Sequence, residues 1–183
     1  MKKITVILTA IIIIVLQQLL LSQDKPFIPV DFNVPDTLEN DYFRIRMLTI
    51  NDVVKDYDAV MSSIDHLNKQ FPHWGWPTKD LTLEQDLIDL GWHQKEFQIR
   101  SSFTYTVVTL DESQVIGCIY IFPAQKGDFD AQINMWVRSS VLDMGYDSIL
   151  YNTVRQWIKT DWPFDKVAYP IREIILDEWN SLK

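Results

Sequence analysis

The sequence predicts a mixed α/β fold of the α+β class, with a mostly antiparallel mixed sheet and helices on both of its faces. Three observations support this prediction: two apolar strand-like segments at 103–122, a strand that runs into an amphipathic helix at 129–158, and two helical patterns between 53 and 97. Strands joined by tight turns pair antiparallel, whereas a helical crossover makes the last strand pair parallel.

The first strand and the helix after it are predicted from their periodicity. Phe43, Ile45 and Met47 alternate with polar residues, which is typical of a strand with one apolar face. A helix follows, with Asn51 or Asp52 as its expected N-cap. The apolar stripe of this helix consists of Val53, Tyr57, Val60, Ile64 and Leu67.

A second helix and a hairpin come next. Thr82 and Gln85 have the spacing of a capping box, and the apolar face of the helix that they start continues to Phe97. Residues 103–110 and 114–122 are rich in β-branched and aromatic residues, and the polar turn between them predicts a hairpin. The second of these strands is apolar on both faces, so we expect it to be central in the sheet.

The segment from 129 to 158 is expected to organise the fold. Its first part alternates, which predicts a strand with one buried face formed by Phe129, Ala131, Ile133, Met135 and Val137. Its last part has a helical stripe of Tyr146, Ile149, Leu150, Val154, Trp157 and Ile158. The loop from Arg138 to Gly145 brings the helix N-terminus to the end of the strand. Since the first backbone N–H groups of a helix lack partners, such a loop is a common anion site.

The C-terminal part is predicted to be short. Trp162 and Pro163 cannot continue the preceding helix, and residues 166–169 form a last short strand. Residues 177–183 are expected to be a tail.

The N-terminal segment has the layout of an export signal. Lys2 and Lys3 precede an uncharged apolar run over residues 4–21, but the chain lacks a well-formed cleavage site near Ser22. We therefore divide the chain into a signal peptide or membrane anchor (1–22), a proline-containing linker (23–40) and a folded domain (41–183). The two lysines favour an N-terminus that stays inside, with the domain outside the cytoplasm. A misassigned start codon, with a cytoplasmic domain, is the third alternative.

Composition excludes several classes of site. The net charge is −8 and no basic patch stands out along the folded part, so we expect no nucleic-acid partner. Cys118 is the only cysteine, so an intramolecular disulfide is excluded, and its apolar strand predicts a buried, inert thiol. His66, His73 and His93 share no metal-ligand spacing, and we expect no metal site.

This order of elements resembles the GNAT family of acyl-CoA-dependent N-acetyltransferases. The segments that carry the resemblance are FRIRMLTINDVVKDYDAVM, ESQVIGCIYIFP and INMWVRSSVLDMGYDSILYNTVRQWI, within residues 42–172. The resemblance implies transfer of an acetyl group from acetyl-CoA to an amine, in a GNAT-like fold with a shortened C-terminal end. The alternative is a non-catalytic GNAT-like module, exported or membrane-tethered, that binds a ligand or partner.

The resemblance also implies a place for acetyl-CoA. In the family, the end of the strand matched by 129–138 pairs its backbone with the pantetheine arm, and the loop after it holds the pyrophosphate. The matching positions in this chain are Trp136, Val137 and Arg138 at the end of the strand, and Gly145 and Tyr146 at the start of the helix.

The loop departs from the family pattern. SSVLDMG has no second glycine beside Gly145, and Asp143 and Asp147 flank the helix start. Carboxylates at a helix N-terminus interact favourably with the helix dipole and would oppose a phosphate at the same place.

Catalytic and substrate residues are matched only weakly. The family uses a base, often a carboxylate, to deprotonate the amine, and a tyrosine to protonate the leaving thiolate. Asp130 and Glu84 are the candidates for the base, and Tyr146 is the candidate for the acid. Trp74 and Trp76 lie in a loop rich in proline and glycine and are expected either to line a substrate pocket or to cover the core.

Overall fold

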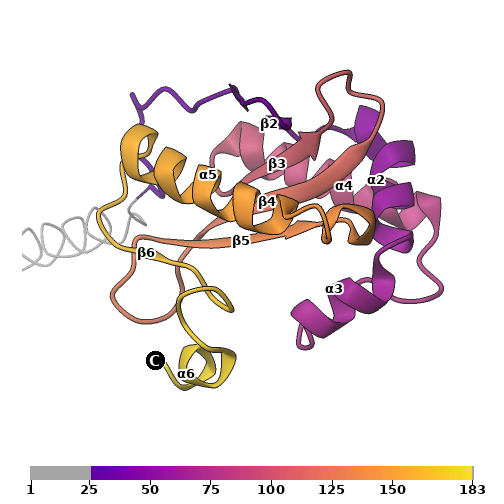
Figure 1. Ribbon diagram of the computed structural model, residues 1–183. Helices are drawn as coiled ribbons and strands as arrows, with labels where there is room; N and C mark the ends of the chain where they lie inside the picture. The colour runs from indigo at the N-terminus through magenta and orange to yellow at the C-terminus, as the bar shows by residue number, and fades with distance from the viewer. Residues whose placement is uncertain (1–25, 183) are drawn as a thin grey trace, which may run out of the picture.

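The computed structural model describes residues 26–182, and its strands form one six-stranded sheet in the order β1-β2-β3-β4-β5-β6 (Figure 1). The strands are β1 (Thr37–Glu39), β2 (Arg44–Met47), β3 (Phe103–Val108), β4 (Val115–Pro123), β5 (Ala131–Val137) and β6 (Val167–Ala168). Neighbours from β1 to β5 are antiparallel, whereas β6 is parallel to β5. The predicted hairpin and the predicted parallel last pair are confirmed.

Helices cover both faces of the sheet. They are η1 (Ile50–Asp52), α2 (Val53–Met61), α3 (Ile64–Gln70), α4 (Leu83–Ile99), η2 (Ser139–Val141), α5 (Tyr146–Asp161) and α6 (Leu176–Ser181). Leu150 and Val154 of α5 belong to the core on one face, and Val60 of α2 and Leu90 of α4 belong to the core on the other. Figure 1 shows α5 in front of the strands, α4 behind them and α2 at the right-hand end of the sheet. The predicted layered architecture is confirmed.

The burial of β5 differs from the expected single buried face. Ile133 and Met135 lie in the core on the α5 side, as expected. Trp136, on the opposite face, is also fully buried, and Asn134 is only 4% exposed. The reason is that β5 lies inside the sheet, where helices and loops cover both of its faces.

The single helix predicted over residues 53–67 is two helices, α2 and α3. The chain turns at Ser62 and Ser63. The hydroxyl of Ser62 donates to the carbonyl oxygen of Ala59 at 3.1 Å, and serine hydroxyls that bond to nearby backbone groups compete with helix continuation. This turn sends α3 toward the end of β5.

Residues 26–40 pack on the domain, which corrects the part of the predicted linker (23–40) that the structure describes. Ile28 is 2% exposed, and the hydroxyl of Tyr105 donates to the carbonyl of Pro35 at 2.7 Å. Residues 37–39 form the edge strand β1. Prolines removed any regular period from this segment, although its apolar side chains still cover the sheet.

The predicted signal peptide or anchor, residues 1–22, lies outside the described residues. None of the helices between residues 26 and 182 combines the length and the hydropathy of a membrane-spanning segment.

The predicted C-terminal tail is also corrected, because residues 176–181 form α6. Trp179 is 6% exposed, and its ring lies 6.1 Å from that of Phe129. Burial of the large Trp179 side chain anchors α6. The helix was not predicted because six residues are too few to show a helical period.

The helix starts agree in part with expectation. The capping box of α4 is confirmed, since the Gln85 N–H donates to Thr82 Oγ1 at 3.2 Å and the Thr82 N–H donates to Gln85 Oε1 at 2.8 Å. Before α2, the expected cap was Asn51 or Asp52. Asp52 does occupy the N-cap position, but its carboxylate accepts the N–H of Thr49 at 3.1 Å, one turn earlier.

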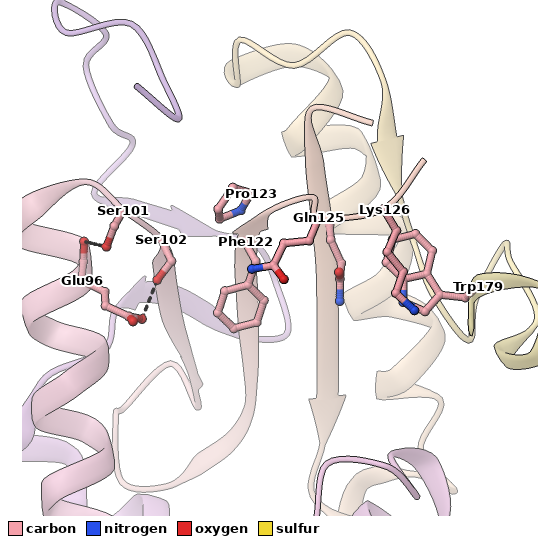
Figure 2. A pocket seen from close by; sticks show the side chains of 9 residues that line it. Glu96, Ser101, Ser102, Phe122, Pro123, Gln125, Lys126 and Trp179 are labelled. Carbon is pink, nitrogen blue, oxygen red and sulfur yellow. Dashed lines mark hydrogen bonds between the residues drawn. The ribbon is translucent and has the colours of Figure 1, made fainter. Parts of the chain in front are cut away.

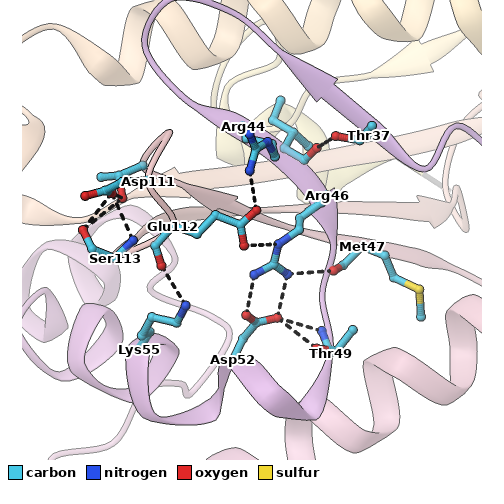
Figure 3. Close-up of polar contacts among 12 residues, drawn as sticks. Thr37, Arg44, Arg46, Met47, Thr49, Asp52, Lys55, Asp111, Glu112 and Ser113 are labelled. Carbon is cyan, nitrogen blue, oxygen red and sulfur yellow. Dashed lines mark hydrogen bonds and ion pairs between the residues drawn. The ribbon is translucent and has the colours of Figure 1, made fainter.

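A charged network joins β2, α2 and the β3–β4 turn (Figure 3). Arg46 donates two hydrogen bonds to Asp52, at 2.7 and 2.9 Å, and a third to Glu112 at 3.0 Å. Glu112 also accepts from Arg44, and its carbonyl accepts from Lys55. Burial raises the pKa of Asp52, but the hydrogen bonds and charge of Arg46 outweigh it and hold that pKa below its usual value.

Two buried carboxyl groups between α2 and α4, those of Asp56 and Asp86, pair with no arginine of the described residues, in contrast to Asp52. Neither carboxylate oxygen of Asp86 has a hydrogen-bond partner within residues 26–182, and Asp56 Oδ1 also lacks one. Burial, then the charge of Asp89, raises the pKa of Asp86 to about 7. Burial, then the charge of Asp86, raises the pKa of Asp56. Both groups therefore favour the protonated form in the folded state.

We predict that Asp86→Asn raises the free energy of unfolding at pH 8 by about 2 kcal/mol and leaves it nearly unchanged at pH 4. In the wild type, folded Asp86 keeps a proton that the unfolded chain releases between about pH 4 and 7, so stability falls as the pH rises through this window. Urea unfolding at a series of pH values measures the difference. Asp80→Asn, at an exposed loop position, is the control, and an unchanged pH slope in Asp86→Asn would contradict the assignment.

Candidate functional site

The half of β5 that extends beyond β6 is the centre of the candidate site. β4 pairs with β5 from Ala131 to Val137, whereas β6 pairs only with Ala131 and Gln132. Residues 133–137 therefore have a free edge on the β6 side. Beyond this half, η2 and the loop lead to Gly145, whose φ of +79° starts α5. Glycine adopts this left-handed conformation without steric cost, which makes it suitable for the turn into the helix.

Side chains of the α2–α3 turn and of α3 contact this half of β5 and the residues just after it. Gln70 Nε2 donates to the carbonyl oxygen of Met135 at 2.9 Å. The N–H of Ser139 donates to Ser63 Oγ at 2.9 Å. Arg138, which is 9% exposed, donates through Nη2 to Asp58 at 2.9 Å and to Ser62 Oγ at 2.8 Å. These contacts were not expected from the sequence, because their partners are separated by more than 60 residues.

The residues expected at the cofactor site do not share one surface. The side chain of Trp136 is buried on the α2–α4 face, where its Nε1 donates to Tyr120 Oη at 3.2 Å. Val137 belongs to the core on the other face. The half-buried ring of Tyr146 also lies on that face, 6.1 Å from the ring of Tyr42. Along the free edge of β5, a ligand would contact the backbone of this strand end. The identities of Trp136 and Val137 therefore say little about whether a ligand binds there.

A cavity of about 330 Å³ lies at the start of α5, and we call it the α5 pocket. Its lining residues are His66, Lys69, Gln70, Leu142, Asp147, Ile171 and Arg172. Arg172 donates to both carboxylate oxygens of Asp147, with 2.6 Å between Nη2 and Oδ1. Burial lowers the pKa of His66, so this imidazole is neutral at pH 7.

This ion pair changes the electrostatics expected for the loop. Asp147 was expected to oppose an anion, but Arg172 compensates its charge. Asp143 is exposed to solvent, where its charge is screened. Together with Lys69, the pocket wall carries two cationic side chains against one carboxylate. The α5 pocket therefore suits an anionic ligand better than the sequence alone suggested.

A smaller cavity of about 180 Å³, the β5 pocket, lies on the other side of Ile171, which both cavities share. It is lined by Phe71, Pro72, His73, Trp74, Gln132, Asn134, Pro170, Ile171, Leu176, Trp179 and Asn180. Gln132 Nε2 donates to Asn134 Oδ1 at 2.8 Å. α6 lines this pocket with Leu176, Trp179 and Asn180, so it supplies no tyrosine as an acid.

The two tryptophans of the loop line a third cavity of about 280 Å³, the aromatic pocket. Its lining residues are Trp74, Trp76, Asp89, His93, Tyr120 and Phe122. Trp74 also lines the β5 pocket, so the two cavities adjoin. The Asp89 and His93 pair was not predicted as functional, although its i, i+4 spacing on a helix was a readable signal.

A fourth cavity of about 380 Å³ continues this surface (Figure 2). Figure 2 shows Glu96 and Ser102 on one side and Lys126 and Trp179 on the other. Ser102 Oγ donates to Glu96 Oε2 at 2.7 Å. This cavity shares Phe122 with the aromatic pocket and Trp179 with the β5 pocket, so the three cavities are neighbours.

The expected catalytic candidates lie outside these cavities. Asp130 Oδ2 accepts the backbone N–H groups of Asp165 and Lys166 at 2.8 and 2.9 Å, which fastens the segment before β6 to the start of β5. Glu84 is exposed in the first turn of α4. Tyr146 packs on the α5 face of the sheet, and no cavity described above includes its side chain.

The remaining composition-based expectations concern Cys118 and metals. Cys118 is 1% exposed, and burial raises the pKa of its thiol, as expected for an inert cysteine. Among residues 26–182, no group of three or more His, Cys, Asp or Glu side chains is arranged to hold a metal ion.

Comparison with known proteins identifies the fold. No protein-family model matches this chain, and no curated protein matches its sequence. Among solved structures, the ribosomal-protein-S5-alanine acetyltransferase from Vibrio fischeri matches with 18% identity and a TM-score of 0.53, over 68% of this chain and 67% of that chain. The ribosomal L7/L12 α-N-protein acetyltransferase RimL matches with 15% identity and a TM-score of 0.51, over 72% and 70%.

A third match is the microcin C7 self-immunity acetyltransferase, solved in complex with acetyl-CoA and AMP. It has 14% identity and a TM-score of 0.51, over 69% of this chain and 66% of that chain. At these identities the likeness establishes the arrangement of helices and strands. The described part of this chain has the fold of the GNAT acetyltransferases.

Proposed function

We propose that this chain transfers an acyl group from an acyl-CoA thioester to an amine. The observation that carries the proposal is the free edge of β5, which lies in a GNAT fold and has a cavity at each end. The α5 pocket lies where the edge leads into a helix N-terminus, and the β5 pocket lies beside Gln132 and Asn134. An elongated ligand with an anionic end and a reactive end matches this arrangement.

The residues of the α5 pocket fit the pyrophosphate of such a ligand. Lys69 and Arg172 supply positive charge, and the first turn of α5 supplies backbone N–H groups. The backbone of residues 133–137 would pair with the amide groups of the pantetheine arm. When bound, acyl-CoA supplies the activated carbonyl group, and the chain orients it and excludes water around it.

A specific observation favours a second candidate, the non-catalytic module. Gln70 occupies the Met135 carbonyl, and Ser63 occupies the Ser139 N–H, in the region where the arm would lie. A chain that had lost acyl-CoA binding would be expected to satisfy these backbone groups internally. An exported or tethered domain of this kind would bind its ligand through the tryptophan side of the site.

Acetyl-CoA binding separates the two candidates. We predict that the full chain binds acetyl-CoA with a micromolar dissociation constant, and that Arg172→Ala weakens binding about tenfold or more because it removes a cation and leaves Asp147 unpaired. Isothermal titration calorimetry measures both values. The control is Arg155→Ala, which removes an exposed arginine of α5 that pairs with Glu173. Absence of binding at millimolar acetyl-CoA would favour the non-catalytic module.

We also predict that Gln70→Ala binds acetyl-CoA about 3- to 10-fold more tightly than the wild type, because the Met135 carbonyl no longer has an internal donor to be displaced. The same titration measures this change. Gln156→Ala, at an exposed position of α5, provides the matched control. Equal affinities of Gln70→Ala and the wild type would mean that the ligand does not use the edge of β5.

A further inference from the structure

The walls of the aromatic pocket are held in place by ring contacts. The ring of Trp74 stacks on Phe71 at a centroid distance of 4.1 Å and meets Tyr120 edge-on at 5.6 Å. Tyr120 stacks on Phe122 at 5.8 Å. Tyr120 is 6% exposed, and its hydroxyl accepts from Trp136, so its position is fixed from the core side. The pocket therefore offers rigid aromatic faces to a ligand.

The charges around this pocket are negative. Asp89 lines it directly, and His93 lies between two carboxylates, 3.8 Å from Asp89 and 3.7 Å from Glu96. None of its six described lining residues is a lysine or an arginine. His93 Nδ1 also lies 3.1 Å from Thr104 Oγ1, which orients the imidazole against the sheet.

Aromatic faces beside a carboxylate attract organic ammonium groups. The π-electrons of tryptophan and tyrosine attract a cation that lies over the ring, and this attraction strengthens when water is excluded. A carboxylate at the rim then pairs with the N–H groups of the cation. An anionic ligand would meet the negative charges of Asp89 and Glu96, and a neutral ligand would not pair with the charge of Asp89.

We propose that the aromatic pocket binds the ammonium group of an organic cation that also carries an apolar or aromatic part, and that this cation is the acceptor amine of the transfer. The second half of this inference rests on the function proposed above. Trp74 lines both the aromatic pocket and the β5 pocket, so an amine beside Asp89 lies next to the place proposed for the thioester.

In the proposed reaction the acyl group passes from the thioester sulfur to the amine nitrogen. The ammonium group first gives one proton to the Asp89 carboxylate. The amine nitrogen forms a bond to the acyl carbon, the carbon–sulfur bond breaks, and the second proton of the nitrogen goes to the departing sulfur. The products are the amide and the free thiol, and Asp89 returns its proton to water.

Binding of a simple probe tests the pocket without any acyl donor. Phenethylammonium is titrated into the full chain by calorimetry, with 2-phenylethanol as the neutral probe of the same shape. We expect the ammonium to bind at least about tenfold more tightly than the alcohol. Asp89→Asn should remove most of this difference, and Trp76→Phe should weaken both probes without unfolding the chain. Asp161→Asn, an exposed carboxylate at the end of α5, removes the same charge far from the pocket and should leave both affinities unchanged.

The outcomes separate this inference from the proposed function. Equal binding of ammonium and alcohol, or an ammonium preference that survives in Asp89→Asn, overturns the cation site even if acetyl-CoA binds. An ammonium preference that Asp89→Asn abolishes supports the site. If the chain then fails to bind acetyl-CoA, the site stands as that of a binding module and its role as acceptor site is overturned. Formation of N-acetylphenethylamine from acetyl-CoA, lost in Asp89→Asn and retained in Asp161→Asn, supports both proposals.

Discussion

β5 is paired with β4 along its whole length but with β6 over only two residues, and the candidate site depends on this unequal pairing. An interior strand normally has both of its edges bonded. Here the half beyond β6 has backbone groups that another partner must satisfy, because buried polar groups without partners are costly. Gln70 of α3 donates to the carbonyl of Met135, and Ser63 of the α2–α3 turn accepts from the N–H of Ser139 just beyond the strand.

Gln70 is one of the side chains that bond to the free backbone groups of β5. Its hydrogen bond covers the edge in the free chain and can be displaced by a ligand. One side-chain hydrogen bond to the Met135 carbonyl contributes about 1 kcal/mol, so a ligand with several amide groups competes with it at modest cost. The cavities at the two ends remain open while the middle of the edge is occupied. Arg172 meanwhile balances Asp147, which leaves the α5 pocket with positive charge. A strand edge with a positively charged cavity beside it is what the proposed acyl-CoA site requires.

The helices and strands could be predicted from residues close in sequence, whereas the candidate site depends on contacts between residues far apart in sequence. The capping box of Thr82 and Gln85 and the alternation in β3 and β4 depend on near neighbours, so they could be read from the sequence. The hydroxyls of Ser62 and Ser63 also accept hydrogen bonds from Arg138 and Ser139, 76 residues away, and these contacts could not be read from the sequence. Trp74 and Trp76 were expected either to line a pocket or to cover the core, and Asp89, which lines the same cavity, was not predicted because nothing local connects it to Trp76. The balancing of Asp147 by Arg172 was missed for the same reason.

Hydrogen–deuterium exchange of the full chain with and without acetyl-CoA tests the central claim most directly. If the edge of β5 is an acyl-CoA site that α3 covers in the free chain, the ligand slows exchange in residues 139–149 and speeds it in residues 64–70. The amides of β3, on the far side of β4, should not change. Protection confined to another surface, or no change at saturating acetyl-CoA, would contradict the account.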